Sequence, residues 1–137
     1  MTTRSHTPDD DHYQTPAYIY DPLDAEFKFD FDPCPYHSTF DGLDISVCWG
    51  KSNFINPPYN RKDKPAFIRR AYNEWKENGA TCVLLIPAST GTEIFHNLIL
   101  PNAEVRFIKG RVKFERDGKR LDSNNGKHDS MIVIFKH

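Results

Sequence analysis

The feature that most constrains the fold is an uninterrupted apolar run from Thr81 to Ile86, bounded by Gly79 and Pro87. The run has the length of a strand, and a strand that is apolar on both faces is typical of a sheet covered by helices on each side. An amphipathic pattern over Pro65–Asn78 precedes it and predicts a helix that ends at Gly79. Together the two patterns predict an α/β fold.

The remaining segments continue this alternation. Thr15 and Pro16 suit the N-cap and the first position of a short helix. Alternating apolar and charged residues predict a strand over Glu26–Asp32, and Asp117-Gly118 is a strong hairpin signal. Further elements are expected at Asn53–Asn56 (strand), Gly91–Leu100 (helix), Glu104–Ile108 (strand), Arg111–Phe114 (strand or turn) and Ser130–Phe135 (strand). This order predicts a mostly parallel sheet with an antiparallel edge.

Length and charge bound the organisation of the chain. We expect residues 1–12, which are polar and acidic, to form a disordered tail, and residues 13–137 to form a single domain. The formal net charge of −1 lacks the overall basic character usual in nucleic-acid-binding domains. The charges are uneven, however, because residues 9–32 carry eight acidic side chains and residues 106–120 carry seven basic ones. The second segment could attract phosphate.

The cysteines Cys34, Cys48 and Cys82 show no C-x-x-C spacing, which favours reduced thiols in a cytosolic protein. Cys34, His37 and Cys48 would offer only three ligands to zinc, so we expect no metal site. No apolar run approaches the roughly 20 residues that a membrane helix needs, and the polar start argues against a signal peptide. We expect no membrane association and a cytoplasmic location.

Asn56-Pro57-Pro58-Tyr59 follows the expected strand at residues 53–56 and carries the clearest chemistry. Consecutive prolines stiffen the backbone and supply no N–H donors. The side-chain oxygen of Asn56 and the carbonyl of Pro57 could each accept one N–H bond of a planar amine, while Tyr59 stacks on its ring. Such acceptors favour the sp³ geometry in which the nitrogen lone pair is free, which is stabilisation specific to the transition state.

Asp32 and Asn56 each end an expected strand. In α/β sheets ligands bind beyond the carboxyl ends of the strands, so both residues are expected at one binding edge.

The chain resembles the small phage-type (Dam-like) DNA N-6-adenine methyltransferases. The resemblance runs from about Asp11 to Phe135, and the motif at 56–59 is specific to amino-methyltransferases. The weaker matching segments are 12–16, 31–34, 41–43, Trp49, 108–114 and the strand from Ser130.

The resemblance implies an abbreviated Rossmann-like fold and S-adenosylmethionine as methyl donor to the exocyclic amine of adenine in DNA. It implies that the catalytic loop is Asn56, Pro57, Pro58 and Tyr59. The residues that it implies for the cofactor are Tyr13, Thr15, Pro16, Asp32, Pro33, Cys34, Asp41 and Asn56. No Gly-rich loop follows Asp32, since Tyr36–Thr39 stands there, so the cofactor pocket must be abbreviated or built differently.

Basic residues beside the catalytic loop are candidates for DNA contact, with a solvated charged surface as the alternative. The candidates are Arg61, Lys62, Lys64, Lys109, Arg111, Lys113, Arg116 and Lys119. The target base must be flipped out of a duplex or offered in a single strand. So small a chain leaves little surface for reading a duplex, which favours a homodimer or a loose sequence preference.

Two other functions remain open. The chain could be a catalytically weak or inactive methyltransferase-fold protein that binds nucleic acid, which the missing Gly-rich loop motivates. It could also methylate another amine or amide, such as cytosine N4 or a protein glutamine, because these acceptors pose the same geometric problem. If phage-encoded, it would act in the cytoplasm of a bacterial host.

Overall fold

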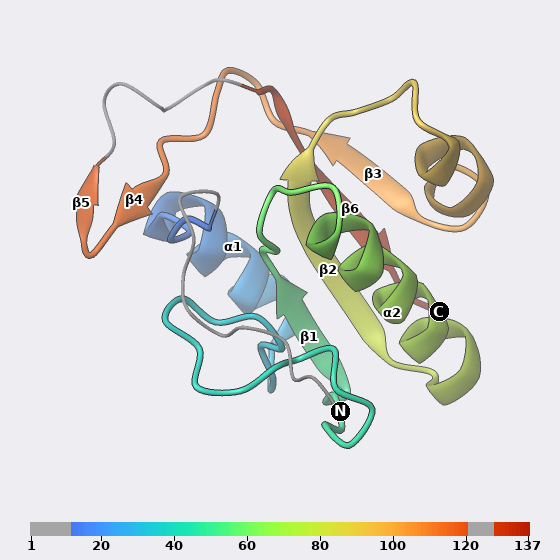
Figure 1. Cartoon of the computed structure of the whole chain (residues 1–137). Coiled ribbons are helices and arrows are strands. Elements are labelled where there is room, and N and C mark those ends of the chain that lie inside the picture. The colour runs from blue at the N-terminus through green and yellow to red at the C-terminus, as the bar shows by residue number, and fades with distance from the viewer. Residues whose placement is uncertain (1–11, 121–127) are drawn as a thin grey trace.

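The computed structural model describes residues 12–120 and 128–137 and is built around a four-stranded sheet (Figure 1). Across the sheet the strands are β1 (Ser52–Ile55), β2 (Thr81–Pro87), β6 (Ser130–Phe135) and β3 (Glu104–Phe107). The helix α2 (Asp63–Asn78) connects β1 to β2, which pair in parallel. The predicted helix at 65–78 and the predicted strands at 53–56, 81–86, 104–108 and 130–135 are thus confirmed within one or two residues at each end.

The position of the antiparallel strand differs from the prediction. The antiparallel strand lies inside the sheet, between β2 and β3, and not at its edge, so two of the three strand pairings are antiparallel. Every residue of β6 is buried, whereas β3 alternates charged Glu104 and Arg106 with apolar residues. The apolar strand therefore takes the interior, and the strand with charged side chains takes the exposed edge, where charges discourage pairing with other chains.

Helices cover both faces of the sheet, which explains its apolar strands. On one face Phe67, Ile68 and Ala71 of α2 pack on Leu84 and neighbouring side chains of β2 and β6. On the other face the helix α1 (Ala17–Phe27) packs Leu23 against a second cluster. That cluster contains Phe54, Val83, Leu85, Val112, Phe114, Ile132 and Ile134.

The predicted strand over Glu26–Asp32 is wrong in its first part. The helix α1 continues to Phe27 and ends at Lys28, whose φ of 52° is left-handed. Tyr20, Leu23 and Phe27 recur at helical spacing and all join the second apolar cluster, so the helical period overrides the alternation. Of the remaining residues only Phe31 forms a bridge, parallel to Asn53 at the edge of β1.

The predicted elements at 91–100 and 111–120 and the predicted tail differ from the structure in detail. The expected helix at 91–100 contains one π-helical turn, η1 (Phe95–Ile99), which packs Phe95 and Ile99 into the core. Segment 111–114 has no regular structure, and the predicted hairpin forms just after it as β4 (Glu115–Arg116) and β5 (Lys119–Arg120). Residues 1–11 of the expected tail lie outside the described residues, and His12, its last residue, is buried.

Candidate active site

The loop Asn56-Pro57-Pro58-Tyr59 begins where β1 ends, at the carboxyl edge of the parallel β1–β2 pair. Asn56 is buried, with 5% of its surface exposed, so its polar groups need partners. Its Nδ2 donates to the backbone oxygen of Tyr13 at 2.9 Å and to Oγ1 of Thr15 at 3.0 Å. Among the described residues no hydrogen bond reaches its Oδ1, which leaves an acceptor at the end of the strand.

The backbone carbonyl of Asn56 is also held. Nε2 of His12 lies 3.1 Å from this oxygen, and Sγ of Cys34 donates to it at 3.5 Å. A carbonyl oxygen only accepts, so Nε2 of His12 must carry the proton in this contact. The backbone carbonyl of Asn56 is therefore engaged within the protein.

Tyr59 is anchored through its hydroxyl. The hydroxyl donates to the backbone oxygen of Leu85 at 3.4 Å, and burial raises the pKa of this phenol. The ring meets Phe114 edge-on at 5.8 Å between centroids and Tyr13 at 6.2 Å. Two aromatic edges thus fix the ring of Tyr59 beside the loop.

A pocket of about 170 Å³ adjoins Asn56. It is lined by His12, Tyr13, Gln14, Thr15, Tyr20, Asp32, Cys34, Tyr36, Phe54 and Asn56. Five residues expected to bind the cofactor therefore meet there: Tyr13, Thr15, Asp32, Cys34 and Asn56.

The other three residues expected at the cofactor do not line this pocket. Pro16 is the N-cap residue of α1, so the predicted N-cap role of Thr15 is wrong, and the Thr15 hydroxyl binds Asn56 instead. Pro33 is buried in the turn after Asp32, and Asp41 accepts the N–H of Leu43 at 3.0 Å. A Cβ added at Gly42 would lie 1.7 Å from the Pro33 oxygen, so this close approach of two loops requires glycine.

Five residues that line the pocket are not among those expected at the cofactor: His12, Gln14, Tyr20, Tyr36 and Phe54. His12 and Gln14 could have been found from their position in the sequence, because they lie within three residues of Thr15, which is expected at the cofactor. The polar and acidic residues before His12 instead predict that it belongs to the tail.

Asp32 places a carboxylate in this pocket. Burial raises its pKa to about 6, although the N–H that Cys34 donates to its Oδ1 at 2.8 Å acts in the opposite direction. At pH 7 the group is therefore mostly ionised, and the pocket favours a cationic ligand.

The basic side chains expected to contact DNA lie on two segments of the chain. Arg61 and Lys62 are exposed between the loop and α2, and Lys64 is half-buried in the first turn of α2, where burial lowers its pKa. Lys109, Arg111, Lys113 and Lys119 are exposed, and Arg111 lies 3.6 Å from Asp129.

The β4–β5 hairpin is docked against the pocket wall. Gln14 exchanges both backbone hydrogen bonds with Glu115, and its Oε1 accepts the N–H of Gly118 at 2.9 Å. The guanidinium of Arg116 lies 5.0 Å from the centroid of the Tyr13 ring. Asp117 accepts from the hydroxyl of Tyr36 at 3.2 Å, so the hairpin tip also reaches a pocket residue. The hairpin thus places the guanidinium of Arg116 beside the site.

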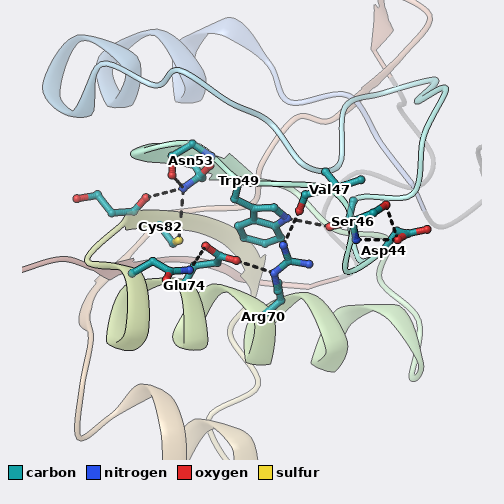
Figure 2. Close-up of polar contacts among 12 residues, drawn as sticks. Asp44, Ser46, Val47, Trp49, Asn53, Arg70, Glu74 and Cys82 are labelled. Atoms are coloured by element: carbon teal, nitrogen blue, oxygen red, sulfur yellow. Dashed lines mark hydrogen bonds and ion pairs between the residues drawn. The ribbon is translucent and has the colours of Figure 1, made fainter.

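The opposite end of β1 has a larger, open hollow of about 890 Å³, but its polar groups bind one another. Arg70 donates to Oε2 of Glu74 at 2.8 Å and to the backbone oxygen of Val47 at 2.7 Å; Figure 2 marks both bonds by dashed lines. The same guanidinium lies 4.9 Å from the Trp49 ring centroid. Because these groups are already paired, we place the candidate site at the smaller pocket.

Within the described residues, no three His, Cys, Asp or Glu side chains are placed to hold a metal ion together. Over the same part of the chain, no helix combines the length and apolarity needed to cross a membrane.

The family model for DNA N-6-adenine-methyltransferase (Dam) matches residues 2–137, which is nearly the whole chain. No curated protein and no solved structure matches the chain. A match of this extent agrees with the order of short motifs around Asn56-Pro57-Pro58-Tyr59 and with the pocket beside them. The chain therefore belongs to the DNA N-6-adenine-methyltransferase (Dam) family.

Proposed function

We propose that this chain transfers a methyl group from S-adenosylmethionine to the N6 amine of adenine in DNA. The observation that carries the proposal is the meeting of Asn56 with Tyr13, Thr15, Asp32 and Cys34 around one pocket. The acceptor oxygen of Asn56 and the residues expected at the methyl donor would then face the same space.

The reaction needs an amine whose lone pair is free. In adenine this lone pair is delocalised into the ring, so the amine is a weak nucleophile. Oδ1 of Asn56 and the carbonyl of Pro57 would accept its two N–H bonds and favour the pyramidal nitrogen of the transition state. Tyr59 would contact the base with its ring, since its hydroxyl is bound to Leu85.

The pocket suits one end of the cofactor. S-adenosylmethionine supplies a methyl group on a positively charged sulfur, and the Asp32 carboxylate with the rings of Tyr13, Tyr20 and Tyr36 would attract a cation. Its volume of about 170 Å³ is below the roughly 300–1,000 Å³ of pockets that hold whole ligands. We infer that it takes the methionine end and that the rest of the cofactor lies more exposed.

We also propose that the sheet is an abbreviated Rossmann-like fold. The unit β1–α2–β2 supports this, since a parallel strand pair with a crossover helix is the repeating element of that fold. The site lies at the carboxyl end of this pair, where such folds bind their ligands.

DNA would lie across the exposed Arg61 and Lys62, across Lys113, and across the hairpin that carries Arg116 and Lys119. These groups would hold phosphates, while the base enters the site from a flipped or single-stranded position. The small size of the chain favours a homodimer or loose sequence preference.

The test is transfer of a labelled methyl group to single-stranded DNA, duplex DNA and RNA offered in parallel. Mass spectrometry of the digested nucleosides should find N6-methyladenine in at least one DNA. Label on protein or on cytosine alone would contradict the proposal. The small pocket also favours a weak or inactive nucleic-acid-binding protein as second candidate, and calorimetry with S-adenosylmethionine separates the two, because no heat would favour the second.

A further inference from the structure

The segment His12–Thr15 touches Asn56 at both its side chain and its backbone. We propose that this segment is a positioning element that fixes the orientation of the Asn56 amide and leaves Oδ1 as the only atom of that amide without a hydrogen bond to the described residues. The inference rests on the proposed function, because it assigns a purpose to Oδ1 in that reaction.

The Tyr13 carbonyl determines which way the amide faces. This oxygen can only accept, so the Asn56 atom 2.9 Å away must be the donor Nδ2. Turning the amide by 180° would set two acceptor oxygens against each other at that distance. The second N–H goes to Oγ1 of Thr15, at 3.0 Å, so both hydrogens of Nδ2 are used within the protein.

The backbone of Asn56 is fixed from the same segment. The protonated Nε2 of His12 donates to its carbonyl, which is also reached by the Cys34 thiol. This carbonyl belongs to the peptide that joins Asn56 to Pro57, so holding it also sets the direction in which the rigid proline pair leaves the strand. His12 is only 6% exposed, which keeps water from competing for the bond.

The arrangement selects an amide over a carboxylate at position 56. In an Asn56→Asp variant an oxygen would replace Nδ2 and face the Tyr13 carbonyl at about the same distance. Nothing in that pair could donate unless the carboxyl group took up a proton. It also means that the Thr15 hydroxyl, expected at the cofactor, acts through Asn56.

The kinetic test compares Thr15→Val, which removes the acceptor, with Thr15→Ser, which keeps it. Losing one neutral hydrogen bond of about 0.5–1.5 kcal/mol should lower kcat roughly 2- to 13-fold. The Kd for S-adenosylmethionine should stay within about 2-fold, and Thr15→Ser should restore kcat. Thr39→Val, at an exposed threonine in the loop after Tyr36, is the matched control. Weaker cofactor binding with kcat unchanged would overturn the proposal.

A second measurement does not depend on activity. In protein labelled with ¹⁵N at asparagine, both Nδ2 protons of Asn56 should exchange slowly with water, and Thr15→Val should speed exchange of one of them. The exposed Asn73 is the internal reference. Exchange at Asn56 as fast as at Asn73 would contradict the orientation. A protected amide in a protein that methylates no DNA would support the orientation and overturn the proposed function alone.

Discussion

Two buried asparagines at the two ends of β1 have opposite hydrogen-bonding arrangements. Asn53 is 0% exposed and Asn56 is 5% exposed. Oδ1 of Asn53 accepts the N–H of Gly50 at 2.8 Å, and its Nδ2 donates to the oxygens of Gly50 and Thr81 (Figure 2). Among the described residues, the side chain of Asn56 binds only through Nδ2. A side chain bound at both ends serves the fold, whereas one that keeps an acceptor free beside a pocket is available for chemistry.

The charged residues near the two asparagines differ in the same way, since they are paired at one end of β1 and available to a ligand at the other. At the Asn53 end, Arg70 pairs with Glu74 and packs on Trp49, so the charges neutralise one another. At the Asn56 end, Asp32 is half-buried with a raised pKa and forms no ion pair with the described residues, so its charge is left for a ligand. Perturbed groups of this kind gather at functional sites more often than elsewhere.

The largest effect is expected from Asn56→Ala. Loss of a group that acts mainly in the transition state should lower kcat by about 10²- to 10³-fold. The Kd for S-adenosylmethionine, measured by calorimetry, should change little. Turnover equal to that of the wild type would show that Asn56 takes no part in the reaction and that it does not differ from Asn53 in function.

Asn53→Ala should do the reverse. It leaves the Gly50 and Thr81 backbone groups without partners, which should lower the free energy of unfolding by about 2–3 kcal/mol. Urea unfolding measures this loss, and methyl transfer per folded molecule should remain. A variant as stable as wild type would show that the complete bonding of Asn53 contributes nothing to the fold.

Much of the fold could be predicted because its signals are local. The run at Thr81–Ile86 and the helical pattern at 65–78 depend only on neighbouring residues, and the structure confirms both. The place of β6 could not be predicted, since the order of strands in a sheet depends on long-range pairing. The motif at 56–59 indicated where the pocket lies. The hydrogen bond between His12 and the carbonyl of Asn56 could not be predicted, because the two residues are 44 positions apart in the sequence.

Asp32→Asn should affect stability and cofactor binding, whereas Asp30→Asn should not, because Asp30 lies two residues earlier and is exposed. The folded pKa of Asp32, about 6, exceeds the unfolded value of about 3.9. Ionised Asp32 therefore destabilises the fold above pH 6 but not below pH 4.

Removing that charge should raise the free energy of unfolding at pH 8 by about 2–3 kcal/mol, with the gain fading toward pH 4. It should also weaken binding of cationic S-adenosylmethionine several-fold. Urea titrations at several pH values and calorimetry measure the two effects. A gain that did not depend on pH, or an equal gain in Asp30→Asn, would contradict this account.

The smallest effect is expected from single basic residues. Arg61→Ala should raise the KM for DNA a few-fold and reduce the dependence of log binding on log salt by about 1, as for one lost phosphate contact. Lys51→Ala, at the exposed residue beside the Asn53 end, is the control. If both variants changed the KM for DNA and its salt dependence equally, the Asn56 end of β1 would not be the side that binds DNA.

The interior position of β6 has a consequence for synthesis of the chain. Strand β3 pairs only with β6 in the four-stranded sheet, and β2 keeps one side unpaired until residues 130–135 arrive. At 5–20 residues per second, translation from residue 87 to residue 135 takes roughly 2–10 s. During that interval the nascent chain presents an apolar strand edge on the ribosome, so in a cell this step is where chaperones are most needed.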